Sequence, residues 1–583
     1  ISLFLPLKME KIPTLKIQVR DRHYSDISFV RAKDLTSIEV DIPSNVVIKN
    51  KLFNQDIFEY DSSKESCLLY HSSIRSMPTI PAVLVLEGRR TYGKWKRRKS
   101  LFKCVPDDKR LPIFLVPYAI KNTFNKRIFN KYTVIKFLSW ENNHPIGTIV
   151  QTIGNVNQLD NFYEYQLYCK SLYASIQDFK KETMKKIKQQ TEEEFIDTIS
   201  SKYNPIDRRD RDIFTIDPLT SKDFDDALGI EKNDATTTLS IYIANVPFWM
   251  DALNLWESFS ERISTIYLPD RKRPMLPTIL SDALCSLQEN RPRFAFTVDV
   301  TFNNQTYEII NIDWCNTLIS VSHNLRYDTK QQENYPAFIT LISFIKKVNI
   351  KYRYVDNIRN CHDVVAYCMI LMNYLSAKKL LEFKTGIFRG VELNKSFTPP
   401  NNVPDNIKNF LKMWNSFGAN YAKFESLKSH EALDLDAYVH VTSPIRRLVD
   451  ILTMVLLQEK LGLVTYSETK QIFYDKWTSD ESLAYINKTM RSIRKVQNDC
   501  SLLKICCDDT KTMDKIYPGY IFDKILRNDK LYQYMVYLPE LKTVNRFTSR
   551  YSKENMSQQR FKLYVFMDEN QLKQKLRIEL LDK

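Results

Sequence analysis

The spacing of apolar residues changes twice along this chain, and this change constrains the fold more than any other feature. Up to about residue 155, short runs of β-branched and aromatic residues are broken by Pro, Asn, Asp and Ser, which is the pattern of short strands. The clearest runs lie at 46–53, 82–88, 112–120 and 132–140. A chain of 583 residues is too long for one hydrophobic core. We therefore expect several domains, beginning with two small β-barrels.

The middle of the chain mixes strand and helix patterns. A strongly charged stretch at 172–198 predicts a solvent-exposed connecting helix. Strand-like runs follow at 213–217 and 239–246. Helical spacing then predicts helices at 336–349, 362–383, 405–417, 444–462 and 480–507. After Tyr517 the pattern returns to strands, which predicts one more small barrel.

These patterns together predict a multidomain α+β protein in five parts. We expect a first barrel at 1–80, a second barrel at 81–160, a helical connector at 161–200, a mixed α/β body at 201–510 and a terminal barrel at 511–583. The sequence starts with Ile1, so processing of the chain and translation from Met9 both stay open.

Composition narrows the class of protein. Lys and Arg number 85 against 69 Asp and Glu, and the resulting net charge of +16 attracts a polyanion such as RNA, DNA or an anionic membrane surface. Only 10 glycines are present, and no GxGxxG or GK[ST] string occurs, which argues against a dinucleotide or P-loop site.

Cysteine usage and hydropathy bear on the compartment. The 10 cysteines form no CxxC pair, which argues against a zinc site and against a secreted disulfide framework. No apolar run approaches the roughly 18–20 residues of a membrane span. We expect an intracellular protein without a membrane partner, in the cytoplasm in the simplest case, with mitochondrial, nuclear and viral origins left open.

Four aspartates follow the strand-like run at 213–217 within ten residues: Asp217, Asp223, Asp225 and Asp226. If the turn brings these carboxylates together, they repel one another and require positive charge. Oxygen-rich sites select Mg²⁺ or Mn²⁺, and two such ions can activate a water and stabilise the leaving oxygen in phosphodiester cleavage. An acidic turn without metal is the competing interpretation, and the two have about equal weight on spacing alone.

A second string, YVHVTSPIRRLVDILTMVLL at 438–457, combines an arginine pair with an apolar helix pattern. Thr442 or Ser443 can cap a helix that starts at Pro444, which places Arg446 and Arg447 in its first turn. Cations there oppose the helix dipole, a cost that a bound phosphate would offset. A surface ion pair is the alternative, and His440 is interpreted as a structural histidine.

Together these two strings resemble the RNB family of 3′→5′ exoribonucleases, which includes ribonuclease II, ribonuclease R and the exosome's catalytic exonuclease. The D-x5-D-x-DD and HxTSPIRR patterns match in order and spacing. Between them, the string at 264–296 is similar to the family's YLP…PMLP…LS…CSL…R segment, and LRYDT at 325–329 to its aromatic stretch. The resemblance implies two cold-shock-like OB barrels, an RNB catalytic body and a terminal S1-like barrel.

The resemblance also implies roles for individual residues. The four aspartates would hold Mg²⁺, with Mn²⁺ as the alternative, and Asp225 would be the most critical for turnover. Arg446 would contact the scissile phosphate, Ser443 and Arg447 would lie beside it at the RNA, and Tyr327 would stack on the terminal base. The implied reaction is processive 3′→5′ hydrolysis of single-stranded RNA to nucleoside 5′-monophosphates by two metal ions. A monomeric catalytic unit and a helicase or exosome-like partner are implied by the same analogy.

Two departures from the family keep rival functions open. Tyr242 and Asn245 stand where many members have a HIADV-like string, and Ala366 and Tyr367 where bacterial members carry two glutamates, one of them implicated in ribose contact. A noncatalytic RNA-binding or scaffold protein is therefore the first alternative. A DNA-directed nuclease with the same metals is the second.

Overall fold

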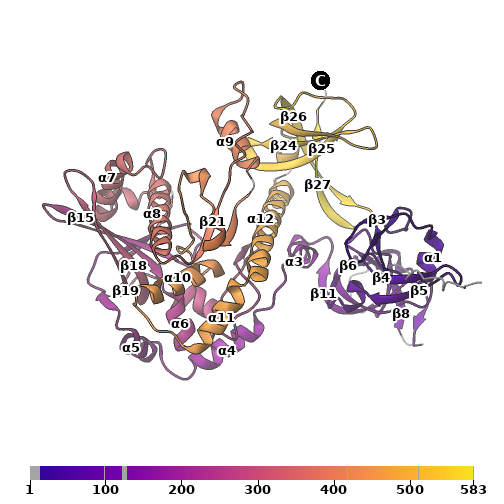
Figure 1. Cartoon of the computed structure of the whole chain (residues 1–583), viewed down its shortest axis with the longest axis horizontal. Helices are drawn as coiled ribbons and strands as arrows, with labels where there is room; N and C mark the ends of the chain where they lie inside the picture. The colour runs from indigo at the N-terminus through magenta and orange to yellow at the C-terminus, as the bar shows by residue number, and fades with distance from the viewer. Residues whose placement is uncertain are drawn as a thin grey trace, which may run out of the picture. The chain divides into compact units, whose positions relative to one another are not determined.

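The fold is described from a computed structural model, which covers residues 14–96, 99–120, 128–327, 329–416, 418–509 and 511–581 (Figure 1). The two predicted starts, Ile1 and Met9, lie outside these residues. The chain forms two compact units: unit 1 combines Ile1–Tyr173 with Asn498–Lys583, and unit 2 is Ala174–Gln497. The five predicted parts therefore group into two units, and their exact boundaries stay a prediction.

Two barrel-like sheets form the N-terminal part of unit 1. The first has the strand order β3-β2-β1-β4-β5, and the second has the order β6-β10-β11-β9-β8-β7, with β6 also pairing with β8. Their strands are β1 Leu15–Val19, β2 Ile27–Arg31, β3 Ser37–Ile38, β4 Ile57–Asp61, β5 Ser66–His71, β6 Ile80–Leu84, β7 Lys94–Trp95, β8 Lys99–Pro106, β9 Phe114–Tyr118, β10 Lys131–Ser139 and β11 Ile146–Asn155. One hydrophobic cluster includes side chains from both sheets, so the two barrels share apolar packing.

The strand predicted at 46–53 is wrong. Residues Ser44–Lys49 form helix α1, which follows Pro43 and ends at Asn50. Val46 and Val47 are buried, while the hydrogen bond from Asn50 N to Val46 O closes the last turn. The β-branched residues Val46 and Val47 suggested a strand. A helix can also bury them against the barrel core, and this tertiary contact outweighs their local preference.

The C-terminal strands form a third five-stranded sheet in unit 1, with the order β25-β24-β23-β26-β27. They are β23 Tyr517–Leu526, β24 Tyr532–Leu538, β25 Thr543–Ser549, β26 Gln558–Asp568 and β27 Lys573–Leu580. The third sheet contacts the second through Asp107, whose carboxylate lies 2.6 Å from Lys573 Nζ and whose backbone oxygen accepts a hydrogen bond from Gln571. Helices α2 Ser73–Ser76, α3 Leu159–Cys169 and α13 Lys511–Asp514 also belong to unit 1, together with the C-terminal part of α12 Asp480–Asp508 from Asn498 on.

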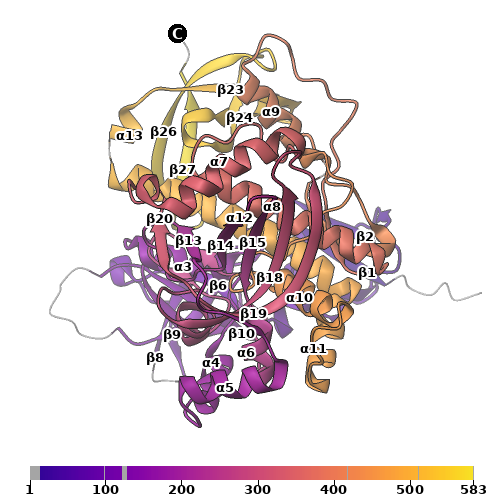
Figure 2. The ribbon, with the colours of Figure 1, turned by 90° about the vertical axis from the view of Figure 1, so that its left-hand side faces the viewer.

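Unit 2 is built on a seven-stranded sheet with the order β12-β19-β18-β15-β14-β13-β20 (Figure 2). The strands are β12 Ile206–Arg208, β13 Phe214–Asp217, β14 Asp226–Lys232, β15 Thr236–Ala244, β18 Pro292–Asn303, β19 Ile309–Ser320 and β20 His323–Arg326. Side chains of β15 alternate between two apolar cores, with Ile241 and Ile243 on one face and Tyr242 and Ala244 on the other. Both faces of the sheet are therefore covered.

Helices cover the two faces of this sheet. One core contains side chains of α7 Pro336–Lys351 and α8 Cys361–Glu382, and the other contains side chains of α5 Glu192–Tyr203 and α6 Val246–Ala252. α10 Leu448–Lys460 contributes side chains to both cores, so most of its surface is buried. The remaining elements are α4 Gln177–Ile187, α9 Asp405–Trp414, α11 Glu468–Thr478, α12 Asp480–Asp508, β16 Ile266–Tyr267, β17 Lys272–Arg273, β21 Ile387–Gly390 and β22 Asn420–Lys423.

The predicted helix at 172–198 is two helices rather than one, α4 and α5. Thr191 separates them because its side chain caps α5, accepting from Glu194 N while Glu194 bonds back to Thr191 N.

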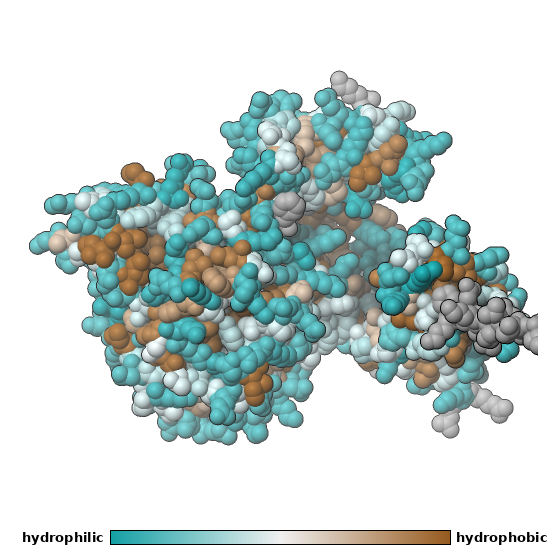
Figure 3. Space-filling view, in the orientation of Figure 1, coloured by the Kyte–Doolittle hydropathy of each residue, from teal (hydrophilic) through white to brown (hydrophobic). Residues whose placement is uncertain are grey.

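Within the described residues, α8 is the one helix long and apolar enough to cross a membrane, and 56% of that stretch is buried inside the structure. Its apolar side chains contribute to the core of unit 2. The face shown in Figure 3 is mainly hydrophilic, with apolar clusters over the part of unit 2 that carries α7 and α8.

Asp251 joins several elements of unit 2. Its side chain is fully buried and accepts hydrogen bonds from Lys202, Tyr203, Trp256 and Ser467 at 2.5–2.9 Å. Burial alone raises the pKa of Asp251, but these donors outweigh it and lower the pKa to about 2. This contribution to stability is present above pH 3.8 and is lost as the pH falls toward 2.

We predict that Asp251→Ala lowers the free energy of unfolding by about 3 kcal/mol at pH 7, because four donors lose their buried acceptor. Urea denaturation followed by circular dichroism measures this loss. Asp197→Asn on the exposed face of α5 is the matched control and should change the unfolding free energy little. Equal stability of the two variants would contradict the structural role of Asp251.

Candidate active site in unit 2

The sheet itself brings the aspartates of the 217–226 string together. Asp217 ends β13 and Asp226 begins β14, and these two strands are antiparallel neighbours. The connecting loop therefore returns to the point where it left the sheet, and it carries Asp223 and Asp225. On the other side of β13, the parallel strand β20 pairs Asp217 with Arg326, so Tyr327 follows at the same edge.

The loop that carries Asp223 and Asp225 is fixed to the rest of unit 2 by backbone contacts. Phe224 N donates to Ser286 Oγ at 3.1 Å, and Leu287 N donates to Phe224 O at 3.0 Å. Ala244 N donates to Asp225 O at 2.8 Å. Ser286 and Leu287 belong to the CSL string, so one purpose of that string is to hold the aspartate loop in place.

The predicted helix at 444–462 starts later than expected, and its expected caps are wrong. α10 begins at Leu448, after Arg447, which has extended backbone angles. Residues 444–447 instead form a turn that pairs with the segment 263–265. Thr265 N donates to Arg446 O, and Leu448 N donates to Ile263 O. These bonds to a neighbouring segment replace the helical bonds, so the arginine pair precedes the helix rather than lying in its first turn.

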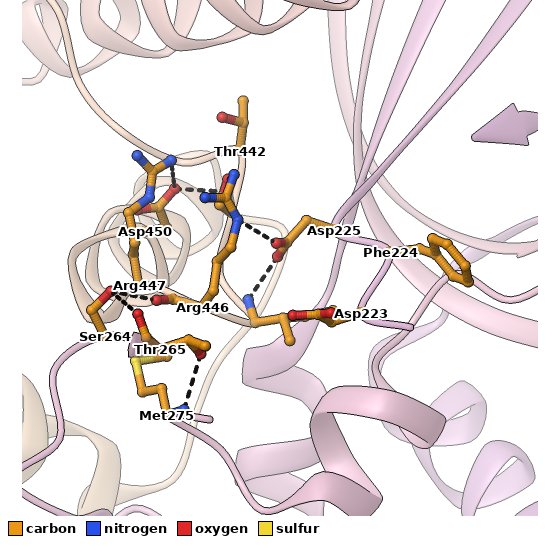
Figure 4. Close-up of polar contacts among 12 residues, drawn as sticks. Asp223, Phe224, Asp225, Ser264, Thr265, Met275, Thr442, Arg446, Arg447 and Asp450 are labelled. Atoms are coloured by element: carbon orange, nitrogen blue, oxygen red, sulfur yellow. Dashed lines mark hydrogen bonds and ion pairs between the residues drawn. The ribbon is translucent and has the colours of Figure 1, made fainter. Parts of the chain in front are cut away.

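Arg446 reaches the aspartate loop from this turn (Figure 4). Its Nε lies 3.1 Å from Asp225 Oδ2, and its Nη2 donates to Ser443 Oγ at 2.7 Å. Ile445 N donates to Asp225 Oδ1 at 2.8 Å. The Asp225 side chain is 4% exposed, whereas that of Arg446 is 42% exposed. Arg446 therefore compensates a buried carboxylate with one edge and presents its other N–H donors to a ligand.

Arg447 and Ser443 have structural partners of their own. Arg447 Nη2 lies 2.9 Å from the buried carboxylate of Asp450, and its Nη1 lies 3.2 Å from His440 Nδ1. Ser443 N donates to the same carboxylate of Asp450, while Ser443 Oγ accepts from Arg446. These contacts position Arg446. For Arg447 and Ser443 they favour a structural role over direct contact with RNA.

A cavity of about 510 Å³ connects these groups. Its lining includes all four aspartates, Arg446, Arg447, Ser443 and Tyr327, which are the predicted site residues. Tyr327 stacks on His362 with ring centroids 4.0 Å apart, and its N donates to Asp217 O. The pocket therefore gathers, in one place, residues that are up to 230 positions apart in the sequence.

The structure adds two residues around the aspartates that the sequence interpretation missed. Tyr267 lines the cavity and donates from its hydroxyl to Asp223 Oδ2 at 3.2 Å. Lys272 Nζ lies 2.9 Å from Asp223 Oδ1 and 2.9 Å from Asp282 Oδ1. Both residues belong to the YLP…PMLP string, so their place in that string is the sequence signal that points to them.

The departures from the family pattern have structural explanations here. Asn245 caps α6 by accepting from Phe248 N, and Tyr242 is buried in the sheet. Tyr367 is buried in the core, whereas Ala366 is exposed. In the described structure none of these four residues lines the cavity.

The carboxylates of the site carry surplus negative charge. Burial raises the pKa of Asp225 to about 7, and Arg446 and the Ile445 N–H only partly oppose this rise. Burial and the charges of neighbouring aspartates also raise the pKa values of Asp217 and Asp226. Asp217 Oδ2 is buried without a hydrogen-bond donor.

These properties fit a divalent cation, which would bind hard carboxylate oxygens and offset their repulsion. Asp217 and Asp226 are best suited to bind this cation. The Oδ2 of Asp217 accepts no hydrogen bond. Among the contacts of the described residues, no side-chain donor reaches the carboxylate of Asp226. In the described part of the chain, no three His, Cys, Asp or Glu side chains already have a metal-ligating arrangement. Asp225 contacts Arg446 and Asp223 contacts Lys272 instead.

Comparisons with known proteins agree with this architecture. Residues 206–334 match the RNB domain, and residues 101–164 match the Dis3-like cold-shock domain 2. The chain is 24% identical over 265 residues to ribonuclease R of Chlamydia trachomatis, covering 43% of this chain and 37% of that protein. It is 25% identical over 369 residues to ribonuclease R of Aquifex aeolicus, covering 50% and 49%. The chain thus spans less than half the length of these curated relatives.

Solved structures match over most of the chain. RNase R of Mycoplasma genitalium without RNA superposes with a TM-score of 0.66 at 17% identity, covering 97% of this chain and 99% of that one. The same protein in complex with ribose-methylated single-stranded RNA gives 0.65 at 16% identity, covering 97% and 100%. Yeast Ssd1, described as a pseudonuclease, gives 0.56 at 15% identity, covering 92% and 78%. These likenesses show the fold and confirm the predicted order of cold-shock barrels, RNB body and terminal strands.

We predict that His440 stays neutral, with its proton on Nε2. Arg447 can only donate, so Nδ1 must be the acceptor, and Tyr421 Oη lies 2.7 Å from the same Nδ1. Burial lowers the pKa of His440 well below its usual 6.5, and the charges of Arg447 and Arg389 lower it further. The stability that neutral His440 contributes is therefore present above pH 6.5 and is lost as the pH falls below it.

Nuclear magnetic resonance of ¹⁵N-histidine-labelled protein tests this prediction. The Nδ1 shift of His440 should be that of an unprotonated nitrogen and should not titrate between about pH 5 and 8. A His440 midpoint near pH 6.5 would contradict the assignment.

Proposed function

Since the chain is a member of the RNB family, we propose that it is a 3′→5′ exoribonuclease that hydrolyses single-stranded RNA to nucleoside 5′-monophosphates. The observation that carries the proposal is the meeting of Arg446 and Asp225 at one cavity, beside Asp217 and Asp226. A guanidinium can stabilise the charge that develops on a phosphodiester during cleavage, and a carboxylate cluster can hold the metal ion that activates water.

The chain's own groups have distinct tasks in this proposal. The outward N–H donors of Arg446 bind the scissile phosphate and stabilise the negative charge that develops on it. Asp225 orients Arg446 through Nε, and Ser443 does so through Nη2. A divalent cation, Mg²⁺ or Mn²⁺, would be held by Asp217 and Asp226 with help from the other aspartates, and when bound it supplies Lewis-acid activation of the attacking water.

Aromatic rings near the phosphate site suit an RNA end. Tyr327 and Tyr267 both line the cavity, and ring stacking on bases tolerates any sequence. Tyr327 would exchange its contact with His362 for a base or extend that stack. The net charge of +16 favours binding of a long polyanion, which supports processive degradation. A helicase or exosome-like partner, a monomeric catalytic unit and an intracellular location stay predictions.

A noncatalytic RNA-binding protein is the second candidate. The likeness to Ssd1 favours it, because a pseudonuclease has this same fold. The intact Asp217–Asp226 string and its contact with Arg446 argue for catalysis instead. The third candidate, a DNA-directed nuclease, is tested by giving the enzyme RNA and DNA of one sequence in parallel.

Incubation with a 5′-labelled single-stranded RNA and Mg²⁺ tests the proposal. We expect a ladder that shortens from the 3′ end to a short limit product, with nucleoside 5′-monophosphates released. Tight binding of the RNA without any shortening, in Mg²⁺ and in Mn²⁺, would replace the proposal by the noncatalytic alternative.

We predict that Asp225→Asn reduces hydrolysis by at least about 100-fold while RNA binding is retained. The amide cannot compensate Arg446 or help to hold a cation. Asp234→Asn makes the same change of charge on an exposed hairpin and should hydrolyse RNA like the wild type. Fluorescence anisotropy measures binding, and single-turnover assays measure cleavage. Hydrolysis by Asp225→Asn at the rate of the control would refute the site.

We predict that Arg446→Met also lowers kcat by about 100-fold or more, with a smaller change in KM, because its charge matters most in the transition state. The exposed Arg271 provides the control Arg271→Met. An increase in KM alone would show that Arg446 serves only to bind RNA.

A further inference from the structure

Two of the four site aspartates are already compensated by cations of the chain. Asp225 is paired with Arg446, and Asp223 is paired with Lys272. The second pair is partly buried, with the Lys272 side chain 23% and the Asp223 side chain 8% exposed. Burial makes this ion pair stronger than one on the surface.

A two-stranded ribbon delivers Lys272 to Asp223. Strands β16 and β17 are antiparallel, and their register places Tyr267 directly opposite Lys272. Both side chains then reach the same carboxylate, Lys272 at Oδ1 and Tyr267 at Oδ2. Asp282 holds the Lys272 ammonium from a second direction at 2.9 Å. Lys272 is thus fixed at three points: by its backbone pairing, by Asp223 and by Asp282.

Asp217 and Asp226 differ from this pair. The Oδ2 of Asp217 is buried and accepts no hydrogen bond, and Arg326, whose charge acts on Asp217, donates to the backbone oxygens of Pro218 and Ser221. The open carboxylates therefore lie at the ends of β13 and β14, and the compensated ones lie in the loop between these strands.

The balance of charges around the aspartates also indicates room for one divalent cation. The carboxylates are Asp217, Asp223, Asp225, Asp226 and Asp282. The cations of this chain that act on them are Lys272, Arg326 and Arg446. When all five carboxylates are ionised, five negative charges face these three positive charges, and the remaining two negative charges equal the charge of one divalent cation.

We propose that Lys272 is a built-in cation of the site, whose ammonium takes the place of a second divalent ion at Asp223. The RNA-free chain then holds one divalent ion, at Asp217 and Asp226, rather than the two expected from the sequence. This inference rests on the proposed function, because it takes the 217–226 aspartates as the metal ligands. Lys272 is a positioning residue that sets how many ions the site accepts.

Mn²⁺ binding to the purified full-length chain, without RNA, tests this inference. Electron paramagnetic resonance and isothermal titration count the bound ions. We expect one tight Mn²⁺ in the wild type and a second one in Lys272→Gln, with an affinity at Asp223 raised at least about tenfold, since a charge-assisted contact no longer competes. Lys272→Arg keeps the charge and should bind one Mn²⁺, like the wild type.

The exposed Lys222 offers a matched control beside the same loop. Lys222→Gln removes one positive charge next to Asp223 but no contact with it, and should still bind a single Mn²⁺. Circular dichroism verifies that each variant is folded. Should Lys272→Gln not fold, the wild-type count alone decides, because two tight ions in the wild type overturn the proposal.

The results separate this inference from the proposed function. Equal Mn²⁺ counts and affinities in the wild type and Lys272→Gln overturn the role of Lys272, even when the wild type degrades RNA from its 3′ end. A second Mn²⁺ in Lys272→Gln supports that role even when the wild type degrades no RNA, in which case the exoribonuclease proposal fails. Absence of Mn²⁺ binding in every protein overturns both.

Discussion

The site depends on one buried contact, that between Asp225 and Arg446. A carboxylate that is 4% exposed must be compensated, and the compensation comes from a residue 221 positions away in the chain. Forming this contact requires the loop between β13 and β14 to close against the turn before α10. The segments 263–265 and 286–287 hold these two pieces in place. The site is therefore formed only when unit 2 is folded as a whole.

Two arginines and two aspartates of the cavity have partners that limit what they can do, whereas the other two aspartates stay open. Asp450 and His440 hold Arg447 in the cavity wall, so Arg446 is the more exposed arginine of the pair and the one better placed to reach a phosphate. Lys272 and Tyr267 occupy Asp223, while Asp217 and Asp226 stay open toward a cation. This division of roles within a run of ten residues explains why four neighbouring aspartates need not act alike.

Sequence patterns predicted the secondary structure well where the local preference of a segment agrees with its tertiary contacts. The strands at 132–140 and 213–217 and the helices at 336–349 and 480–507 fall close to β10, β13, α7 and α12. The strand expected at 46–53 and the helix start at 444 were wrong for a common reason. In both places, contacts with distant segments overrode the local preference, burial of Val46 and Val47 in one case and hydrogen bonds to residues 263–265 in the other.

The sequence by itself determined the order of the parts, the strand that ends at Asp217 and the likeness to a nuclease family, because strand periodicity and motif spacing are local properties. Only the tertiary structure decided which charges pair. Arg446 and Arg447 are adjacent in the sequence but differ in exposure and partners, and Lys272 reaches Asp223 through a strand pairing that no motif encodes. Pairing energy depends on distance and burial, and both are set by the folded chain.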